Sequence, residues 1–441
     1  MLTRLEISNF KTFEDFGIDL EGFAVVLGPN AAGKSNLFDA LRFLAALATD
    51  DVATATQSVR GQLHELFRTP DLPIRFACEV LLDPTVVDSF EQRHELKNTR
   101  LRYEVSLSRQ STGRMQRVVV SHEKVTKLSR EHDPLRKRIH RSSPIGPRYA
   151  QHGDYLATEH RTAGQYFVVT QDGRQGRKRE TPAAAALATN LSTMRDATFL
   201  HLFALAEELR SWRFLQFDPA VLRRPSEQTA AADGLEPDGS NLARVLGRMQ
   251  DTGADATLKE IAEFLDELIG GIDAVTPTFL ESTREWELTF DTRRDGPVSA
   301  RVVSDGTIRM TALLAAVLDP VARGLICFEE PENGVHPQRL KSLMHMLPSF
   351  TTDLDDQDER PPLRQVIVNS HSPVVLASVP EKAVFFADRV TRVGGGHEAA
   401  SVTRLRPVES RLFSDEGTAD KRVTVIEVEQ YLGSAKSEHG V

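Results

Sequence analysis

The amino-acid sequence predicts an α/β fold built on a mixed β-sheet, and three observations indicate it. An apolar run, Phe23 to Leu27, leads into a glycine-containing loop and then a helical pattern from Asn36 to Ala48. Two further apolar runs, 325–328 and 366–368, read as buried strands that end in polar side chains. Residues 75–82, 101–107 and 116–121 alternate apolar and polar side chains, which is typical of half-buried antiparallel strands.

The loop after the first apolar run has the pattern G-x-x-x-x-G-K-S of a phosphate-binding loop. Two glycines allow the backbone to curl so that successive N–H groups point at phosphate oxygens, and the helix start adds the positive end of its dipole. The lysine reaches the β- and γ-phosphates, and the serine hydroxyl ligates Mg²⁺. The strand before the loop and the helix after it favour this interpretation over a chance glycine-rich turn. The expected nucleotide-binding residues are Gly28, Pro29, Asn30, Ala31, Ala32, Gly33, Lys34, Ser35 and Asn36.

The second apolar run ends in the acidic sequence Glu329-Glu330-Pro331-Glu332. A buried strand that delivers two acids at its carboxyl end is the Walker B arrangement, in which the first acid sits near Mg²⁺ and the second activates water. We therefore expect Glu329 at the metal and Glu330 as the general base. The first position is more often Asp, so Glu329 is a departure from the pattern. The alternative is a strand followed by a solvated acidic turn.

Two more segments have the character of a nucleotide site. The third apolar run ends in Asn369-Ser370-His371-Ser372-Pro373, where a histidine can hydrogen-bond a γ-phosphate; the alternative is a capping or packing residue. A serine and glycine pair, Ser304 and Gly306, precedes a helical run from Ile308 to Leu318. Backbone N–H groups at such a helix start bind anions, although an ordinary N-cap gives the same pattern.

The order of these segments resembles that of the ABC-type ATPases, and within them the SMC/RecF-like branch. The similarity is greatest to RecF-like AAA ATPases of bacterial defence and DNA-repair loci, related to the overcoming-lysogenisation-defect family but without a Toprim domain. It covers both ends of the chain and not residues 85–210. The segments that carry it are Ile7 to Phe13, Gly28 to Ser35, Asp238 to Leu242, Ser304 to Thr307, Phe328 to Pro337, and Asn369 to Pro373.

The resemblance implies a two-lobed ATPase head, with a mixed central sheet, an antiparallel β subdomain and a helical lobe, that works as a homodimer. ATP on the phosphate loop of one subunit would be capped by Ser304 and Gly306 of the other, and Glu330 and His371 would act on its γ-phosphate. Lys11, with Asn9, falls where the family's N-terminal hairpin approaches the nucleotide. Asn333 and Gly334 fall at the segment that crosses the dimer. Gln216, after the strand-like run 212–215, is a candidate for the loop that joins the lobes; an ordinary core strand is the alternative.

Four regions follow from the pattern along the chain. We expect an N-terminal ATPase lobe over 1–121, a basic and partly flexible insertion over 122–194, a helical lobe and linker over 195–300, and a C-terminal ATPase lobe over 301–441. The insertion has basic clusters at 136–141 and 174–179. These clusters indicate either a solvated surface or a contact with nucleic acid through phosphate neutralisation.

Composition narrows the function further. The net charge of -9 over 441 residues excludes a chain that is basic throughout, so a nucleic-acid surface must be local. Cys78 and Cys327 lie in apolar runs and are expected to be reduced core residues. The sequence has no membrane-span pattern or signal peptide, so a cytoplasmic protein is expected. The absence of sustained heptads argues against a machine with long coiled-coil arms.

Three functions compete on these grounds. The first is an ATPase of a bacterial antiphage defence system that gates a nucleic-acid-directed process carried out by a separate effector, a nuclease or toxin. Only about 70 residues follow His371, too few for a nuclease domain of ~100, which favours an effector on another chain. The second is a RecF-like repair or recombination ATPase that binds DNA directly. The third, a transporter subunit, is disfavoured because the chain has Val-Ser-Asp-Gly-Thr where such subunits have a Leu-Ser-Gly-Gly-Gln type signature.

Overall fold

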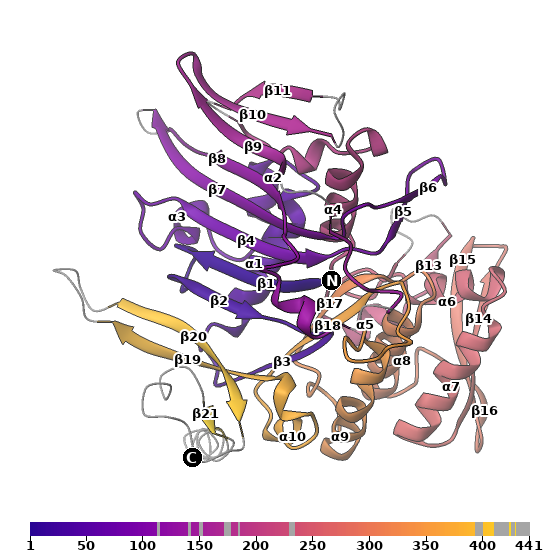
Figure 1. Cartoon of the computed structure of the whole chain (residues 1–441). Helices are drawn as coiled ribbons and strands as arrows, with labels where there is room; N and C mark the ends of the chain where they lie inside the picture. Colours follow the sequence, from indigo (N-terminus) through magenta and orange to yellow (C-terminus); the bar gives the residue numbers. More distant parts are fainter. Residues whose placement is uncertain are drawn as a thin grey trace.

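An eight-stranded and a seven-stranded β-sheet organise the chain. Helices lie between these two sheets and on the far side of the seven-stranded sheet (Figure 1). The computed structural model describes residues 1–112, 115–139, 143–149, 153–171, 178–183, 186–228, 234–392, 400–409, 423–424 and 428. The mixed α/β fold class expected from the sequence is confirmed, including the antiparallel β subdomain and the helical lobe.

The larger sheet has eight antiparallel strands. Their spatial order is β11 (Lys178–Pro182), β10 (Gly164–Thr170), β9 (Asp154–Arg161), β8 (Met115–Lys127), β7 (Arg100–Thr112), β4 (Ile74–Leu81), β1 (Leu2–Ser8) and β2 (Phe16–Asp19). The inner face of this sheet packs on the helices α1 (Lys34–Leu47) and α4 (Leu200–Arg210). The short helices α2 (Val52–Gln57) and α3 (Leu63–Leu66) follow α1, and the hairpin of β5 (Thr85–Val87) and β6 (Arg93–Glu95) follows β4.

The second sheet has seven strands and is mostly parallel. Its order is β12 (Arg213–Leu215), β17 (Gly324–Glu329), β18 (Arg364–Ser370), β3 (Phe23–Leu27), β19 (Val384–Arg392), β20 (Ala400–Glu409) and β21 (Val423–Thr424). The first five strands run parallel to their neighbours, and β20 returns antiparallel to β19. The carboxyl ends of β12, β17, β18 and β3 therefore lie along one edge of the sheet.

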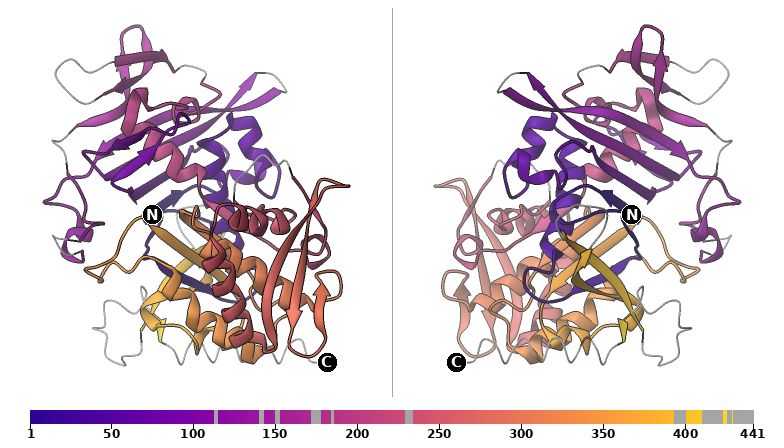
Figure 2. Two further views of the ribbon diagram at one scale, coloured as in Figure 1. Left: turned by 90° about the vertical axis from the view of Figure 1, so that its right-hand side faces the viewer. Right: turned by 90° about the vertical axis from the view of Figure 1, so that its left-hand side faces the viewer.

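The parallel strands separate two hydrophobic cores, which explains why they read as continuous apolar runs. In β3, Ala24 and Val26 pack toward α1 and the larger sheet, whereas Val25 and Leu27 pack toward the helical lobe. A strand that is buried on both faces keeps no polar side. Figure 2 shows the antiparallel sheet and the helical lobe on opposite sides of these strands.

The helical lobe covers the far face of the parallel sheet. It consists of α5 (Pro219–Leu222), α6 (Leu242–Asp251), α7 (Asp255–Ile269), α8 (Asp305–Leu318), α9 (Pro337–Met346) and α10 (Pro373–Leu376). A small sheet packs on it, made of β13 (Ser226–Glu227), β15 (Glu285–Thr292), β14 (Ile272–Leu280) and β16 (Gly296–Ser299). Among the described residues, no helix is long and apolar enough to cross a membrane.

The region boundaries expected from the sequence differ from the structure in two places. Residue 122, where an insertion was expected to begin, lies inside β8, and β9 to β11 continue the same sheet. The segment therefore extends the first lobe. Residues 272–299, expected to belong to a helical lobe and linker, form β14 to β16. Most of the basic cluster 174–179, and the polar tail after 409 apart from three residues, lie outside the described residues.

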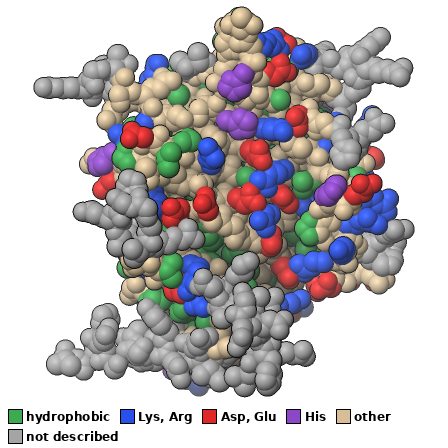
Figure 3. All heavy atoms as spheres, turned by 60° about the vertical axis from the view of Figure 1, so that its left-hand side comes forward, with side chains coloured by type: hydrophobic (Ala, Val, Ile, Leu, Met, Phe, Trp, Pro, Cys, Tyr) green, Lys and Arg blue, Asp and Glu red, His purple; other side chains and the backbone are tan. Residues whose placement is uncertain are grey.

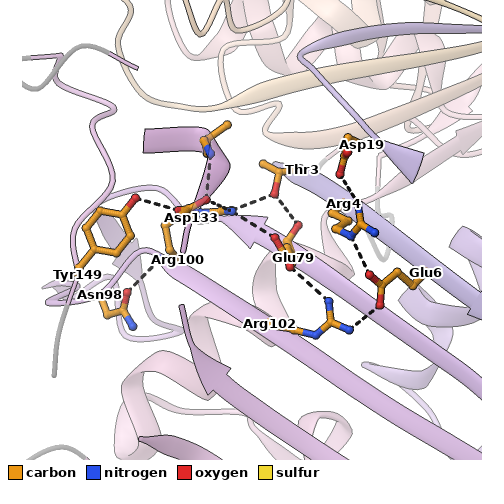
Figure 4. Close-up of polar contacts among 11 residues, drawn as sticks. Thr3, Arg4, Glu6, Asp19, Glu79, Asn98, Arg100, Arg102, Asp133 and Tyr149 are labelled. Carbon is orange, nitrogen blue, oxygen red and sulfur yellow. Dashed lines mark hydrogen bonds and ion pairs between the residues drawn. The ribbon is translucent and has the colours of Figure 1, made fainter. Parts of the chain in front are cut away.

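The first basic cluster is anchored to the sheet by a buried ion pair. Arg100, 1% exposed, donates from Nε and Nη2 to the two carboxylate oxygens of Asp133 at 2.7 and 3.0 Å, and Tyr149 donates to the same carboxylate at 2.8 Å (Figure 4). Asp133 caps the 3₁₀ helix Pro134–Lys137, and Leu135 and Ile139 pack into a small apolar cluster. The described part of this cluster is thus held in place by a buried anchor.

Candidate nucleotide site

The carboxyl edge of the parallel sheet brings together the phosphate loop, the acidic strand end and the histidine. In the register of the sheet, Leu27 at the end of β3 pairs with Ser370, and Asn369 pairs with Glu329 at the end of β17. Segments that are about 300 residues apart in the sequence therefore meet at one edge of the sheet.

The glycines of the loop are required by close contacts with the C-terminal strands. A Cβ on Gly28 would lie 2.4 Å from the carbonyl oxygen of Ala387 in β19. Gly33 has φ of 96°, and a Cβ there would lie 2.0 Å from Oγ1 of Thr403 in β20. Real Cβ atoms do not approach so closely, and a positive φ strains any side chain. These contacts position the loop from outside its own motif.

A short hydroxyl network ties the loop to the N-terminal turn. Asn36 donates to Oγ1 of Thr12 at 2.8 Å, and Oγ1 of Thr403 contacts Oγ1 of Thr12 at 2.7 Å and the carbonyl oxygen of Ala32 at 3.1 Å. Neither threonine was expected from the sequence. Thr12 follows Lys11, which was expected near the nucleotide, so the sequence pointed to this turn. Thr403 lies 370 residues beyond Gly33, and no sequence pattern linked it to the loop.

Lys34, the first residue of α1, folds back over the loop. Its ammonium group donates to the carbonyl oxygens of Gly28 and Pro29 at 2.7 and 2.8 Å. Burial lowers its pKa to about 8, and the negative charges of Glu330 and Glu332 oppose that shift. The phosphate-loop lysine and these two acids are therefore close enough to interact electrostatically.

The two acids of the strand end have different surroundings. Glu329 receives an ion pair from Nη2 of Arg42 at 3.5 Å, and burial raises the pKa of its carboxyl group, with Arg42 opposing. Glu330 begins the turn after β17 with φ of 50°, and Asn333 donates its side-chain amide to Glu330 Oε2 at 2.7 Å.

Glu332 joins this turn to the histidine. Its Oε1 accepts from the backbone N–H of His371 at 2.8 Å and lies 3.0 Å from Nδ1 of the same residue. The sequence contained Glu332 within the acidic run, but it gave no sign that this acid, rather than Glu330, would contact His371.

Lys11 lies beside α1 and is engaged there. Its ammonium group donates to Asp39 Oδ2 at 2.5 Å and to the carbonyl oxygen of Arg60 at 2.6 Å. Asp39, 1% exposed, also pairs with the Arg60 side chain at 3.1 Å. In this structure the expected nucleotide ligand is therefore a partner of Asp39, and Thr12 makes the contact with the loop network.

The oxygen atoms at this edge of the sheet fit a magnesium ion that binds together with a nucleotide. Mg²⁺ is usually held by one or two carboxylates together with substrate phosphates and water. The hydroxyl of half-buried Ser35 and the carboxylate of Glu329 are the expected protein ligands. Two buried acceptors at the same edge, Asn369 Oδ1 and Glu332 Oε2, have no donor within the part of the chain that the structure describes. Within the described residues, no group of three or more His, Cys, Asp or Glu forms a metal cage.

The remaining expected residues lie at the start of α8 and at the end of β12. Ser304 caps α8 by accepting from the N–H of Thr307 at 3.1 Å, and a Cβ on Gly306 would lie 3.3 Å from the carbonyl oxygen of Gly334. The predicted dimer-capping and dimer-crossing segments are thus neighbours. Gln216 is exposed after β12, on the same edge as β17, and its N–H donates to Pro237.

The phosphate-loop motif, the acid-ended strand and the histidine-ended strand lie in one parallel sheet, which places the chain in the P-loop α/β class of folds. The chain matches the AAA domain family described as "putative AbiEii toxin, Type IV TA system" over residues 23–162 and 217–377, and it belongs to that family.

Two curated relatives match over a short segment. The chromosome partition protein Smc of Methanocaldococcus jannaschii is 43% identical over 44 residues, and structural maintenance of chromosomes protein 1 of Schizosaccharomyces pombe is 49% identical over 45 residues. Each match covers 10% of this chain and 4% of the relative, so the chain spans a small part of the length of these proteins.

Among solved structures, an Smc head bound to the C-terminal winged-helix domain of ScpA has a TM-score of 0.48 at 11% identity, covering 92% of this chain and 97% of that one. The Pyrococcus furiosus Smc head with an extended coiled coil, bound to the C-terminal domain of ScpA, has a TM-score of 0.45 at 13% identity, covering 92% and 96%. The Thermotoga maritima SMC head has a TM-score of 0.38 at 11% identity, covering 92% and 99%.

Proposed function

We propose that this protein binds and hydrolyses ATP as a homodimer and thereby gates a nucleic-acid-directed process in a bacterial antiphage defence system. The observation that carries the ATPase part is that the phosphate loop after β3, the acidic end of β17 and the histidine after β18 meet at one edge of the parallel sheet. A lysine and a general base that belong to one reaction must face the same phosphate.

Each residue of the edge has a role in this reaction. The N–H groups of the loop and the start of α1 bind the phosphates, and Lys34 exchanges its bonds to Gly28 and Pro29 for phosphate oxygens. Bound Mg²⁺ would neutralise charge on the β- and γ-phosphates, with Ser35 and Glu329 holding it. Glu330 takes a proton from the attacking water, and His371 donates to the γ-phosphate.

The homodimer part of the proposal rests on the start of α8. Ser304 and Gly306 present a capped helix start beside Gly334, a suitable surface for the phosphates of a second subunit. The defence role is supported by the family description, a putative toxin of a type IV toxin–antitoxin system.

A second function, RecF-like DNA binding for repair or recombination, is favoured by one observation. Arg136 and Lys137 are exposed on a 3₁₀ helix that is fixed by Asp133 and Leu135, so their charges are presented from an ordered segment. Arg138 of the same cluster is engaged with Glu21 at 2.8 Å. DNA affinity depends on the number of phosphates that Lys and Arg neutralise, and this segment offers only two such cations. DNA binding is therefore the weaker of the two proposed functions.

A pull-down from the native host, with tagged Glu330→Gln protein, ATP and Mg²⁺, tests these proposals. Both bound protein and bound nucleic acid are identified, and Lys34→Ala protein serves as the control that cannot form the ATP state. A stoichiometric partner with nuclease or toxin features supports the defence ATPase. Bound DNA without such a partner supports the RecF-like function, and the Arg136→Glu/Lys137→Glu variant then tests the first basic cluster. Equal capture by both baits contradicts ATP gating.

A further inference from the structure

Glu332 concentrates three donors on one carboxylate oxygen. Its Oε1 accepts from the hydroxyl of Ser370 at 2.8 Å and from the N–H of His371 at 2.8 Å, and it lies 3.0 Å from His371 Nδ1. The Glu332 side chain is only 11% exposed. A carboxylate accepts and does not donate, so the short contact requires a proton on Nδ1 of the imidazole. Nε2, on the opposite side of the ring, then faces away from Glu332.

The second oxygen of Glu332 is buried, and among the described residues it has no hydrogen-bond donor. The same holds for Oδ1 of neighbouring Asn369. A buried acceptor left without a donor costs about 1–3 kcal/mol. The charge of Glu332 also acts on Lys34, so this carboxylate lies within electrostatic range of the phosphate loop. A buried carboxylate oxygen that is left without a donor beside a phosphate site points to a functional use of Glu332.

We propose that Glu332 is a positioning residue for ATP hydrolysis, which holds His371 with Nδ1 protonated and directs Nε2 toward the γ-phosphate. This inference rests on the ATPase function proposed above. With Nδ1 already donating to Glu332, Nε2 can donate to a phosphate oxygen only when it too carries a proton. The ring is then an imidazolium cation whose counter-ion is Glu332. The pair delivers a positive charge to the γ-phosphate at a fixed position.

A purely structural role for Glu332 would leave a different signature. The bonds from Ser370 and from the His371 backbone could serve only to close the turn between β18 and α10. Such a role would affect folding or the position of the turn without depending on the imidazole of His371. The tautomer of His371 and its energetic coupling to Glu332 separate the two roles.

The first experiment records ¹⁵N spectra of the full chain with labelled histidine and without nucleotide. The His371 signals are assigned as those lost in His371→Gln. We expect a protonated Nδ1 and an unprotonated Nε2 for neutral His371 in the wild type, and a shift toward the Nε2-protonated tautomer in Glu332→Ala. If Glu332→Ala does not fold, the tautomer of the wild-type ring alone tests the proposal. A wild-type ring with protonated Nε2 and bare Nδ1 would overturn the proposal.

The second experiment measures steady-state ATP hydrolysis. Glu332→Ala is expected to lower kcat about 10- to 100-fold, by analogy with partners that orient metal-binding histidines, with KM within about twofold. In a His371→Gln background the same change is expected to alter kcat less than about twofold, because Glu332 then has no imidazole to position. The matched control is Glu287→Ala. Glu287 lies on β15 and pairs with Arg301 at 2.8 Å, and its removal should keep wild-type rates.

The outcomes distinguish this inference from the function on which it rests. Equal losses of kcat on Glu332→Ala in both backgrounds would show that Glu332 acts independently of His371 and would overturn the positioning role. If His371→Gln itself hydrolyses ATP at the wild-type rate, the role proposed for His371 in the reaction fails. The spectra still report the Glu332–His371 contact in that case, because they need no nucleotide.

Discussion

The side-chain amide of Asn333 donates to Oε2 of Glu330 at 2.7 Å, so the proposed dimer-crossing residue holds the proposed general base. Glu330 has φ of 50°, a left-handed conformation that costs a residue with a Cβ roughly 1 kcal/mol or more. The N–H of Glu330 bonds to Asn369 at 2.9 Å, and the N–H of Asn333 bonds back to Glu330 at 3.1 Å. The strained turn is thus fixed at both ends, which sets the direction of the Glu330 carboxylate.

Glu330→Gln is expected to abolish turnover while nucleotide binding survives. The amide keeps an oxygen for Asn333 but cannot accept the proton of the attacking water, and general bases contribute about 10²–10⁴ in rate. We expect kcat to fall by at least about 100-fold and the protein to elute as an ATP-dependent dimer in size-exclusion chromatography with light scattering. The control is Glu287→Gln. Hydrolysis at the wild-type rate by Glu330→Gln would remove Glu330 from the role of base.

Lys34→Ala is expected to lose affinity for the nucleotide and not only the rate of hydrolysis. A hydrogen bond from a charged donor is worth about 1.5–3 kcal/mol, so the Kd for a fluorescent ATP analogue should rise about 10- to 100-fold. Equilibrium titration followed by fluorescence anisotropy measures it, with Lys341→Ala on the exposed face of α9 as the control. Tight binding of the analogue by Lys34→Ala would mean that residues 28–35 do not form the phosphate site.

The parts of the site that the sequence predicted are those built from local patterns. The phosphate loop, Glu329-Glu330 and His371 each follow an apolar strand directly, and such motifs are read within about ten residues. Parallel strands place their carboxyl ends at one edge, so the meeting of these motifs follows from the fold class.

The parts that the sequence did not predict depend on long-range pairing of side chains. Thr403 reaches Gly33 because β20 returns beside β19, and no local pattern specifies that return. The bond from Glu332 to His371 likewise depends on how the turns after β17 and β18 approach each other. The expected boundary at residue 122 failed because a change in composition was read as a change in fold, although β8 runs through it.

Asp133→Asn is expected to destabilise the larger sheet in a way that depends on pH. Burial alone would raise the pKa of Asp133, but the hydrogen bonds and charge of Arg100, with Tyr149, hold it below its ordinary value. Since the pKa is lowered on folding, this group stabilises the fold above its unfolded pKa of about 4, and the contribution is lost as pH falls through the folded pKa. Removing one partner of a buried ion pair costs about 3–5 kcal/mol.

Equilibrium urea unfolding of the wild type and Asp133→Asn at pH 7 and at several values below pH 4 measures this effect. The difference in free energy of unfolding should be largest at pH 7 and should shrink in the acidic series, because the wild-type carboxylate then becomes neutral like the amide. Asp154→Asn, an acid 3.6 Å from Lys124 on the same sheet, is the control with little expected effect. A difference that stays constant with pH would assign the loss to packing rather than to charge.

Arg42→Met is expected to destabilise the protein through Glu329, and removal of the Glu329 charge should restore part of the loss. The Arg42 guanidinium lies 3.5 Å from Glu329, 3.8 Å from Asp39 and 5.2 Å from the centre of the Phe214 ring. Asp39 keeps Lys11 and Arg60 in the variant, whereas Glu329 loses the one cation with which it is paired among the described residues.

Because both partners are partly exposed, we expect a loss of about 1–2 kcal/mol for Arg42→Met rather than the full cost of a buried pair. In a double-mutant cycle with Glu329→Gln, the coupling energy should be about 1 kcal/mol, measured by urea unfolding without nucleotide. Arg42→Lys, which retains the charge on a different head group, should fall between the wild type and Arg42→Met. A coupling energy near zero would mean that Glu329 can turn to a metal ion without giving up a stabilising contact with Arg42. A clear coupling would mean that nucleotide and Mg²⁺ must compete with Arg42 for this carboxylate.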